Sequence, residues 1–166
     1  RTAIAYMEKA DLFSSLHVNA HKSRRIWGLE TYFLNMATDE RAVMVAAREN
    51  ATSEKNISDL QAILNDLMLN TKIHESSRLA HAIQNGLVSG IKKRYEMVKS
   101  LGVKQAPFYV LIGAQMPAVL IEAGFLTNPM EKKRLLSATY RRSVADGIIS
   151  GIASYMETIN RVYQGG

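Results

Sequence analysis

A single carboxylate at the end of an apolar run is the first feature of this sequence that could do chemistry. Residues 119–121 (Val-Leu-Ile) lead directly into Glu122, and the run is bounded by Pro117 and Gly124. Such a run predicts a buried strand. Because an unpaired ionised carboxylate is costly to bury, we expect Glu122 at the carboxyl end of the strand, facing a cleft. Ligands bind there in open α/β sheets. The residue types alone favour a plainer interpretation, in which Glu122 pairs with a Lys or Arg.

A second polar group follows another short apolar segment. Residues 11–16 predict a strand with His17 at its end, and Asn19 lies two residues further on the same side. Neutral imidazole binds zinc, and a glutamate can act as general base toward a zinc-bound water. His17 and Glu122 are therefore a candidate hydrolytic site. A lone histidine is more often structural, and Asn19 could orient a substrate or, as we favour, hold the loop.

Alternating strands and helices must position these residues. We expect strands at 11–16, 28–34, 108–112 and 119–122, and helices at 1–9, 41–49, 58–69, 75–101, 130–136 and 143–162. Leu60, Ile63, Leu64 and Leu67 form an apolar stripe, and Gly86 and Gly90 indicate close helix packing. This order predicts a single α/β domain whose twisted, mixed or mostly parallel sheet lies between helix layers.

Composition narrows the functional class. The chain has 166 residues, of which 47% are apolar and 22% charged, as in an ordinary globular domain. No apolar run approaches the ~18 residues of a membrane helix, and no signal-peptide pattern is present. The chain opens with Arg1 rather than Met, so we expect a piece of a longer protein. Cysteine is absent, which excludes disulfides and cysteine-ligated zinc.

The net charge of +6 and the pI near 9.6 suit a polyanionic neighbour, such as nucleic acid, an anionic membrane surface or an acidic cell-wall polymer. The basic clusters at 92–94, 132–134 and 141–142 lie in expected helices, where a solvated face also explains them. No aromatic stacking pattern accompanies them, so we do not expect a nucleic-acid partner.

Four motifs in order carry a resemblance to a known family. They are ADLFSSLHVNA (10–20), GLETYFL (28–34), ESSRLAHAIQ (75–84) and KQAPFYVLIGAQMPAVLIEAGFLTNPMEKKRL (104–135). Together they resemble the zinc-dependent N-acetylmuramoyl-L-alanine amidases of the amidase-3 type, over residues 1 to about 155. The resemblance implies a six-stranded sheet, His17 as a zinc ligand and Glu122 as the general base. It also implies Zn²⁺ as cofactor, peptidoglycan as substrate and a periplasmic or extracellular location.

The same resemblance implies that part of the metal site is missing. The family holds zinc with two histidines and one glutamate, and only the second histidine has a match, His17. The other two ligands precede the equivalent of Arg1. We therefore expect residues 1–162 to be a catalytic domain lacking its N-terminal part, followed by a tail at 163–166.

Residues 36–70 resemble the inserted helical element of division-associated family members, which covers the active site until an activator protein displaces it. Residues 48–51 match the stretch that carries a zinc-occupying glutamate in some of them. Glu49 is thus a hypothetical plug carboxylate, although a surface glutamate remains the more favoured alternative.

The implied function is hydrolysis of the amide between N-acetylmuramic acid and L-alanine, used in wall remodelling, daughter-cell separation or lysis. The alternative is a non-catalytic peptidoglycan-binding or regulatory fragment, which the missing ligands favour.

Overall fold

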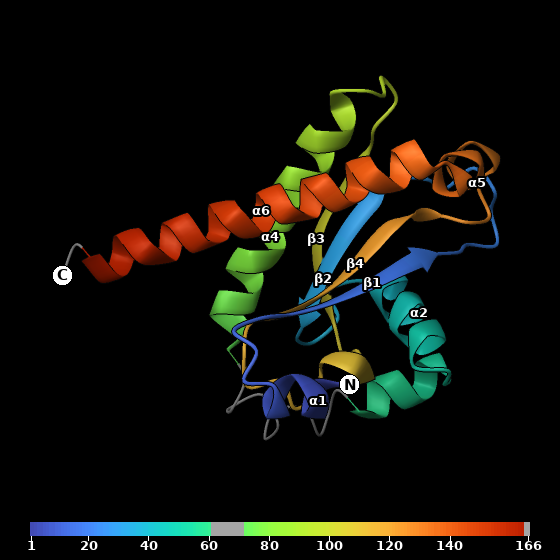
Figure 1. Ribbon diagram of the computed structural model, residues 1–166. Helices are drawn as coiled ribbons and strands as arrows, with labels where there is room; N and C mark the ends of the chain where they lie inside the picture. Colours follow the sequence, from blue (N-terminus) through green and yellow to red (C-terminus); the bar gives the residue numbers. More distant parts are fainter. Residues whose placement is uncertain (61–71, 165–166) are drawn as a thin grey trace.

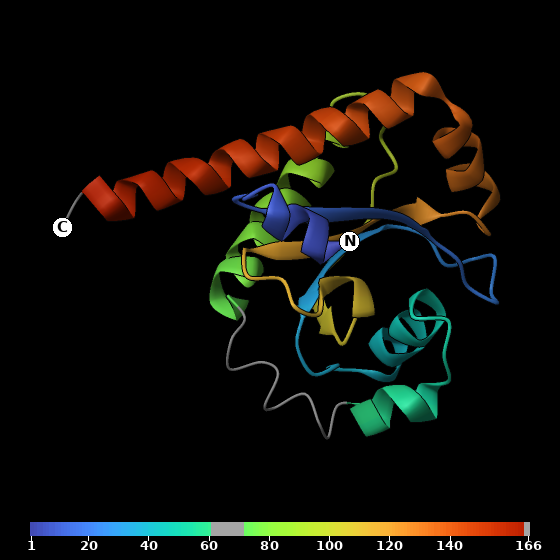
Figure 2. The same cartoon turned by 60° about the horizontal axis from the view of Figure 1, so that its bottom comes forward.

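The computed structural model describes residues 1–60 and 72–164, which form three layers. A four-stranded sheet lies in the middle. The long helices α4 (Ile73–Lys92) and α6 (Ala138–Gln164) cover one face, and α2 (Glu40–Glu49) covers the other. Figure 2 shows this order from α6, through the sheet, to α2. The predicted α/β class with a mixed sheet is confirmed.

The sheet has the strand order β1-β4-β2-β3, so β1 and β3 are its outermost strands. The strands are β1 (Phe13–Asn19), β2 (Leu29–Leu34), β3 (Ser100–Ala106) and β4 (Ala118–Phe125). The pairs β1–β4 and β2–β3 are parallel, and β2–β4 is antiparallel. The two inner strands, β2 and β4, are buried along their whole length.

Local sequence signals explain where the flanking helices begin. The side chain of Asp39 caps α2 by accepting a bond from the Ala42 N–H at 2.7 Å. Asn128 caps α5 (Pro129–Leu136) in the same way, with Pro129 in its first turn. The remaining short helices are α1 (Thr2–Met7), η1 (Tyr109–Leu111) and residues 54–60.

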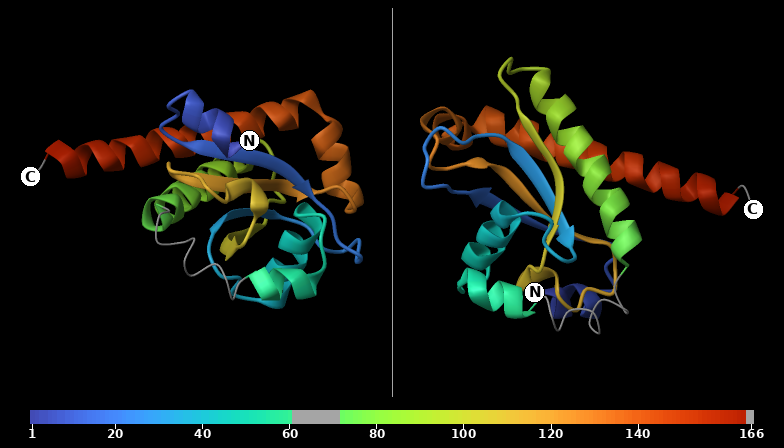
Figure 3. Two further views of the ribbon diagram at one scale, coloured as in Figure 1. Left: turned by 90° about the horizontal axis from the view of Figure 1, so that it is seen from below. Right: turned by 180° about the vertical axis from the view of Figure 1, so that it is seen from behind.

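Helices α4 and α6 pack backbone to backbone, as Gly86 and Gly90 predicted. A Cβ atom on Gly147 would lie 2.9 Å from the Cα of Leu87, and one on Gly151 would lie 2.5 Å from the Cα of Ile83. Only residues without a side chain allow this approach. Beyond this contact α6 extends past the sheet toward the C-terminus (Figure 3).

Two predicted elements are wrong. The helix expected at 75–101 ends at Lys92, because Ile91 is its last core-facing residue and three cations follow. The strand expected at 108–112 is the 3-10 helix η1, and the real strand, β3, precedes it. As an outermost strand β3 is only half-buried, so it lacks the apolar run that marks an inner strand.

Three boundaries also differ. Strand β1 continues to Asn19 and β4 to Phe125, so His17 and Glu122 lie inside their strands rather than at the ends. Helix α6 begins at Ala138, five residues earlier than predicted. Of the helix predicted at 58–69, residues 61–69 lie outside the described residues, and with them Ile63, Leu64 and Leu67 of the predicted stripe; Leu60 is described and packs, partly buried, against the core. Within the part of the chain that the structure describes, no helix is both long and apolar enough to span a membrane.

Candidate active site

Three ionisable residues lie side by side across the middle of the sheet. In the strand register, Glu122 of β4 is opposite His17 of β1 on one side and Glu30 of β2 on the other. Residues in register on neighbouring strands share a face of the sheet. The face is the one that α2 covers, since His17 and Glu30 both contact side chains of α2. The sheet therefore brings together the two residues predicted as a site, His17 and Glu122.

Glu122 is completely buried, and neither of its carboxylate oxygens has a hydrogen-bond partner among the described residues. Burial is the main cause that raises the pKa of Glu122 to about 9; the carboxylates of Glu49 and Glu30 contribute to this rise, and Arg48 opposes it. In this conformation Glu122 is therefore protonated at neutral pH. Such a strongly perturbed carboxyl is typical of a functional group rather than of a structural ion pair.

His17 is held between a carboxylate and a hydroxyl. Its Nδ1 donates to Glu49 Oε2 at 2.5 Å, and its Nε2 lies 2.9 Å from Ser15 Oγ. Glu49 is the last residue of α2, so the C-terminal end of that helix contacts the sheet at His17. The structure thus places the predicted plug residue against the predicted metal ligand.

Glu30 is a buried carboxylate that the sequence analysis missed. Its Oε1 accepts from Asn19 Nδ2 at 2.6 Å, its Oε2 accepts from Arg41 Nη2 at 3.2 Å, and Lys104 Nζ lies 3.7 Å from Oε2. One available signal was a carboxylate in the middle of the strand predicted at 28–34. A charge in a buried strand needs compensation, and here three groups supply it.

Both the nitrogen and the oxygen of the Asn19 side-chain amide make hydrogen bonds within the protein. Besides donating to Glu30, it accepts at Oδ1 from the Ala20 N–H at 2.7 Å and from Arg48 Nη2 at 2.5 Å. Arg48 also donates to the carbonyl oxygen of Ala20. These contacts fit the loop-holding role of Asn19 better than the substrate-orienting one, and both roles stay predictions.

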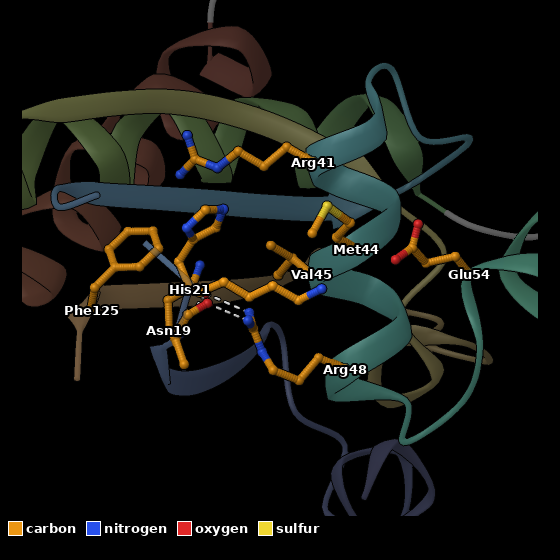
Figure 4. Close-up of a pocket in the computed structure, with 10 residues that line it drawn as sticks. Asn19, His21, Arg41, Met44, Val45, Arg48, Glu54 and Phe125 are labelled. Carbon is orange, nitrogen blue, oxygen red and sulfur yellow. Dashed lines mark hydrogen bonds between the residues drawn. The ribbon is translucent and has the colours of Figure 1, made fainter. Parts of the chain in front are cut away.

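Two pockets flank α2. One, of about 390 Å³, lies between α2 and the loop after β1, and Figure 4 shows Arg41 and Arg48 reaching into it from the helix. The other, of about 410 Å³, includes His17 and Glu49. Glu122 lines neither pocket. The first pocket is lined by Asn19, Ala20, His21, Lys22, Arg41, Met44, Val45, Arg48, Glu54 and Phe125.

The described residues do not form a complete catalytic zinc site. Such a site needs three protein ligands and an open position, and no group of three His, Cys, Asp or Glu side chains in residues 1–60 and 72–164 is arranged to hold a metal. His17 supplies one imidazole, whose two nitrogens contact Glu49 and Ser15.

Comparisons with known proteins agree on one family. The family model described as N-acetylmuramoyl-L-alanine amidase (Amidase_3) matches residues 1–154. An uncharacterised Bacillus subtilis protein, YqiI, is 34% identical over 157 residues, which cover 95% of this chain and 57% of that protein. The Escherichia coli amidase AmiA is 32% identical over 164 residues, covering 93% and 55%.

The fold has solved counterparts as well. The crystal structure of an N-acetylmuramoyl-L-alanine amidase from Clostridium difficile superposes with a TM-score of 0.66 at 29% identity, over 94% of this chain and 63% of that one. The chain thus spans a little over half the length of the two relatives named above. The family match covers most of the chain, and the strand register joins two of the motif residues, His17 and Glu122; the chain belongs to the amidase-3 family of N-acetylmuramoyl-L-alanine amidases.

Proposed function

We propose that this chain forms the larger part of a peptidoglycan amidase that hydrolyses the amide between N-acetylmuramic acid and L-alanine. The observation that carries the proposal is Glu122, a buried carboxyl without a hydrogen-bond partner among the described residues, in register with His17. Family membership and relatives named as amidases support the same reaction. The corresponding location is the periplasm or the cell exterior, where this substrate is found.

Glu122 is the general base of the proposed reaction. In its ionised form it removes a proton from the attacking water, whose oxygen bonds to the carbonyl carbon of the amide. As the carbon–nitrogen bond breaks, the proton passes to the departing nitrogen of L-alanine. The products are a carboxylic acid on the sugar and a free amino terminus on the peptide.

The test is to incubate the protein with purified peptidoglycan and count new L-alanine amino termini. Glu122→Gln keeps the size of the side chain and should abolish their release, whereas Glu8→Gln, at an exposed glutamate, should leave it unchanged. Wild-type release by Glu122→Gln would refute the assignment.

We also propose that the hydrolysis depends on zinc. His17 would be one ligand, and zinc analysis of the intact protein checks the idea directly. His17→Ala should lower zinc occupancy, and equal occupancy in wild type and variant would exclude His17 as a ligand.

Glu49 is proposed as an inhibitory contact. Its carboxylate accepts the hydrogen bond from His17 Nδ1, and its negative charge adds to the burial that raises the pKa of Glu122. A partner protein that moves the end of α2 would release both residues. One solved structure with this fold, the CwlD amidase from Clostridioides difficile, is a complex with the lipoprotein GerS. Glu49→Ala should raise basal hydrolysis, and an unchanged rate would exclude the inhibitory role.

The second candidate is a non-catalytic peptidoglycan-binding or regulatory fragment. It is favoured because no three side chains among the described residues are grouped so that they could hold a metal ion. Protein that contains no zinc, binds peptidoglycan and releases no amino termini would establish this candidate instead.

A further inference from the structure

Five exposed cations lie on two segments that are far apart in the sequence. Lys22, Arg24 and Arg25 lie on the loop at 20–28, and Lys132 and Lys133 lie on α5. We call these five residues the cationic rim. The loop contains no acidic residue, and no ion pair is found for any rim residue among residues 1–60 and 72–164.

The loop and α5 are fixed to one another. The His21 N–H donates to Thr127 Oγ1 at 3.0 Å, Asn128 Nδ2 donates to the carbonyl oxygen of Arg24 at 2.9 Å, and the Gly28 N–H donates to buried Glu131 Oε1 at 3.0 Å. Figure 1 shows the loop and α5 together at one end of the sheet. The backbone that carries the rim is therefore preorganised, and a ligand would not have to order it.

The rim begins at the pocket shown in Figure 4 and continues outside it. His21 and Lys22 line the pocket, whereas the other four rim residues do not. Charges that converged on one point would suit a single carboxylate, but these are spread over two elements and suit an extended chain of anions. Lysine and arginine are common phosphate-binding residues.

We propose that the cationic rim binds an extended phosphodiester polymer of the cell wall. This contact would hold the protein on the wall through charge, independently of hydrolysis. The net charge of +6 is consistent with such a neighbour.

The protein contains a single tryptophan, Trp27, which lies in the rim loop. Its ring contacts Lys99, whose Nζ is 5.8 Å from the ring centroid. Trp27 fluorescence can therefore report binding during a titration with poly(glycerol phosphate). We expect saturable binding that weakens as sodium chloride is added, because the interaction depends on charge.

The test variant is Lys22→Gln, Arg24→Gln and Arg25→Gln combined. The matched control is Lys9→Gln, Lys55→Gln and Lys72→Gln, which removes the same charge from exposed residues outside the rim loop and α5. Each cation near an anionic surface contributes up to roughly a fivefold factor in affinity. Three such cations multiply to at most about a hundredfold, so the rim variant should bind roughly tenfold to a hundredfold more weakly, whereas the control should stay close to wild type.

Three results would overturn the proposal. The rim variant could bind as tightly as wild type, or the control could lose as much affinity as the rim variant, which would show a general charge effect. Poly-L-glutamate of equal length could bind as tightly as poly(glycerol phosphate), which would exclude phosphodiester recognition. Thermal unfolding of each variant checks that the fold is intact. None of these readouts depends on amidase activity.

Discussion

Replacing Glu122 by glutamine should change how the stability of the protein depends on pH. In the folded protein burial raises the pKa of Glu122 to about 9, against an ordinary value of 4.5. Because its pKa is higher in the folded than in the unfolded state, Glu122 makes its full contribution to the free energy of unfolding below pH 4.5. This contribution is lost as the pH rises toward 9. Between these values only the unfolded chain ionises at this position.

The magnitude follows from linkage. Each pH unit in this window lowers the free energy of unfolding by somewhat more than ~1 kcal/mol, so the step from pH 6 to pH 8 costs the wild type roughly 3 kcal/mol through Glu122. Glu122→Gln removes this dependence because glutamine does not titrate. The cost of burying an amide instead of a carboxyl is independent of pH and cancels when the two pH values are compared.

Urea unfolding of both proteins at pH 6 and pH 8 measures the effect. The free energy of unfolding of Glu122→Gln relative to wild type should rise by roughly 3 kcal/mol between the two pH values. Glu131, whose pKa burial raises to about 6, titrates in both proteins and drops out of the difference. Glu8→Gln, at an exposed site, should follow the wild type at both pH values.

Parallel pH profiles for wild type and Glu122→Gln would refute the reasoning. They would mean that Glu122 is ionised in the folded protein at neutral pH, with an ion partner that compensates its burial.

Three further substitutions test the packing around the site by urea unfolding at one pH. Gly151→Ala should destabilise the protein by roughly 1–3 kcal/mol, because a Cβ there would lie 2.5 Å from the Cα of Ile83. Gly90→Ala should destabilise it less, because the nearest atom to a Cβ there is 3.1 Å away. The reverse order would contradict the described contact between α4 and α6. Arg41→Gln removes a cation that compensates the buried carboxylate of Glu30, and it should lower the free energy of unfolding by roughly 1–3 kcal/mol. A loss below about 0.5 kcal/mol would show that Asn19 and Lys104 are enough to stabilise this carboxylate. Asn128→Ala removes the α5 cap and the bond to Arg24, for an expected loss of about 1–2 kcal/mol, and unaltered stability would show that water replaces both.

Helices and strands that carry a local sequence signal could be predicted from the sequence. Asp39 and Asn128 cap the starts of α2 and α5, and the apolar run before Glu122 identified β4, one of the two inner strands. Strand β3 was not predicted, because an outermost strand needs no apolar run and because its partner, β2, lies far away in the sequence.

The site was predictable in part for the same reason. His17 and Glu122 each follow an apolar segment, so their residue types suggested a pair. Glu30 became part of the site only through the antiparallel register of β2 with β4, which no local pattern encodes. The cover that α2 provides likewise depends on tertiary contacts, of which the bond from His17 to Glu49 is one.

The outermost position of β1 bears on how the protein behaves at high concentration. Its Leu16 and Val18 side chains are 58% and 44% exposed and border an apolar groove of about 310 Å³ against α6. Among the described residues no strand pairs with the free edge of β1. An open edge with apolar side chains is a template for strands of other molecules. In the described part of the chain, β1 is therefore the edge at which a further strand, from the same protein or from another molecule, would add, and Val18→Lys should weaken such pairing.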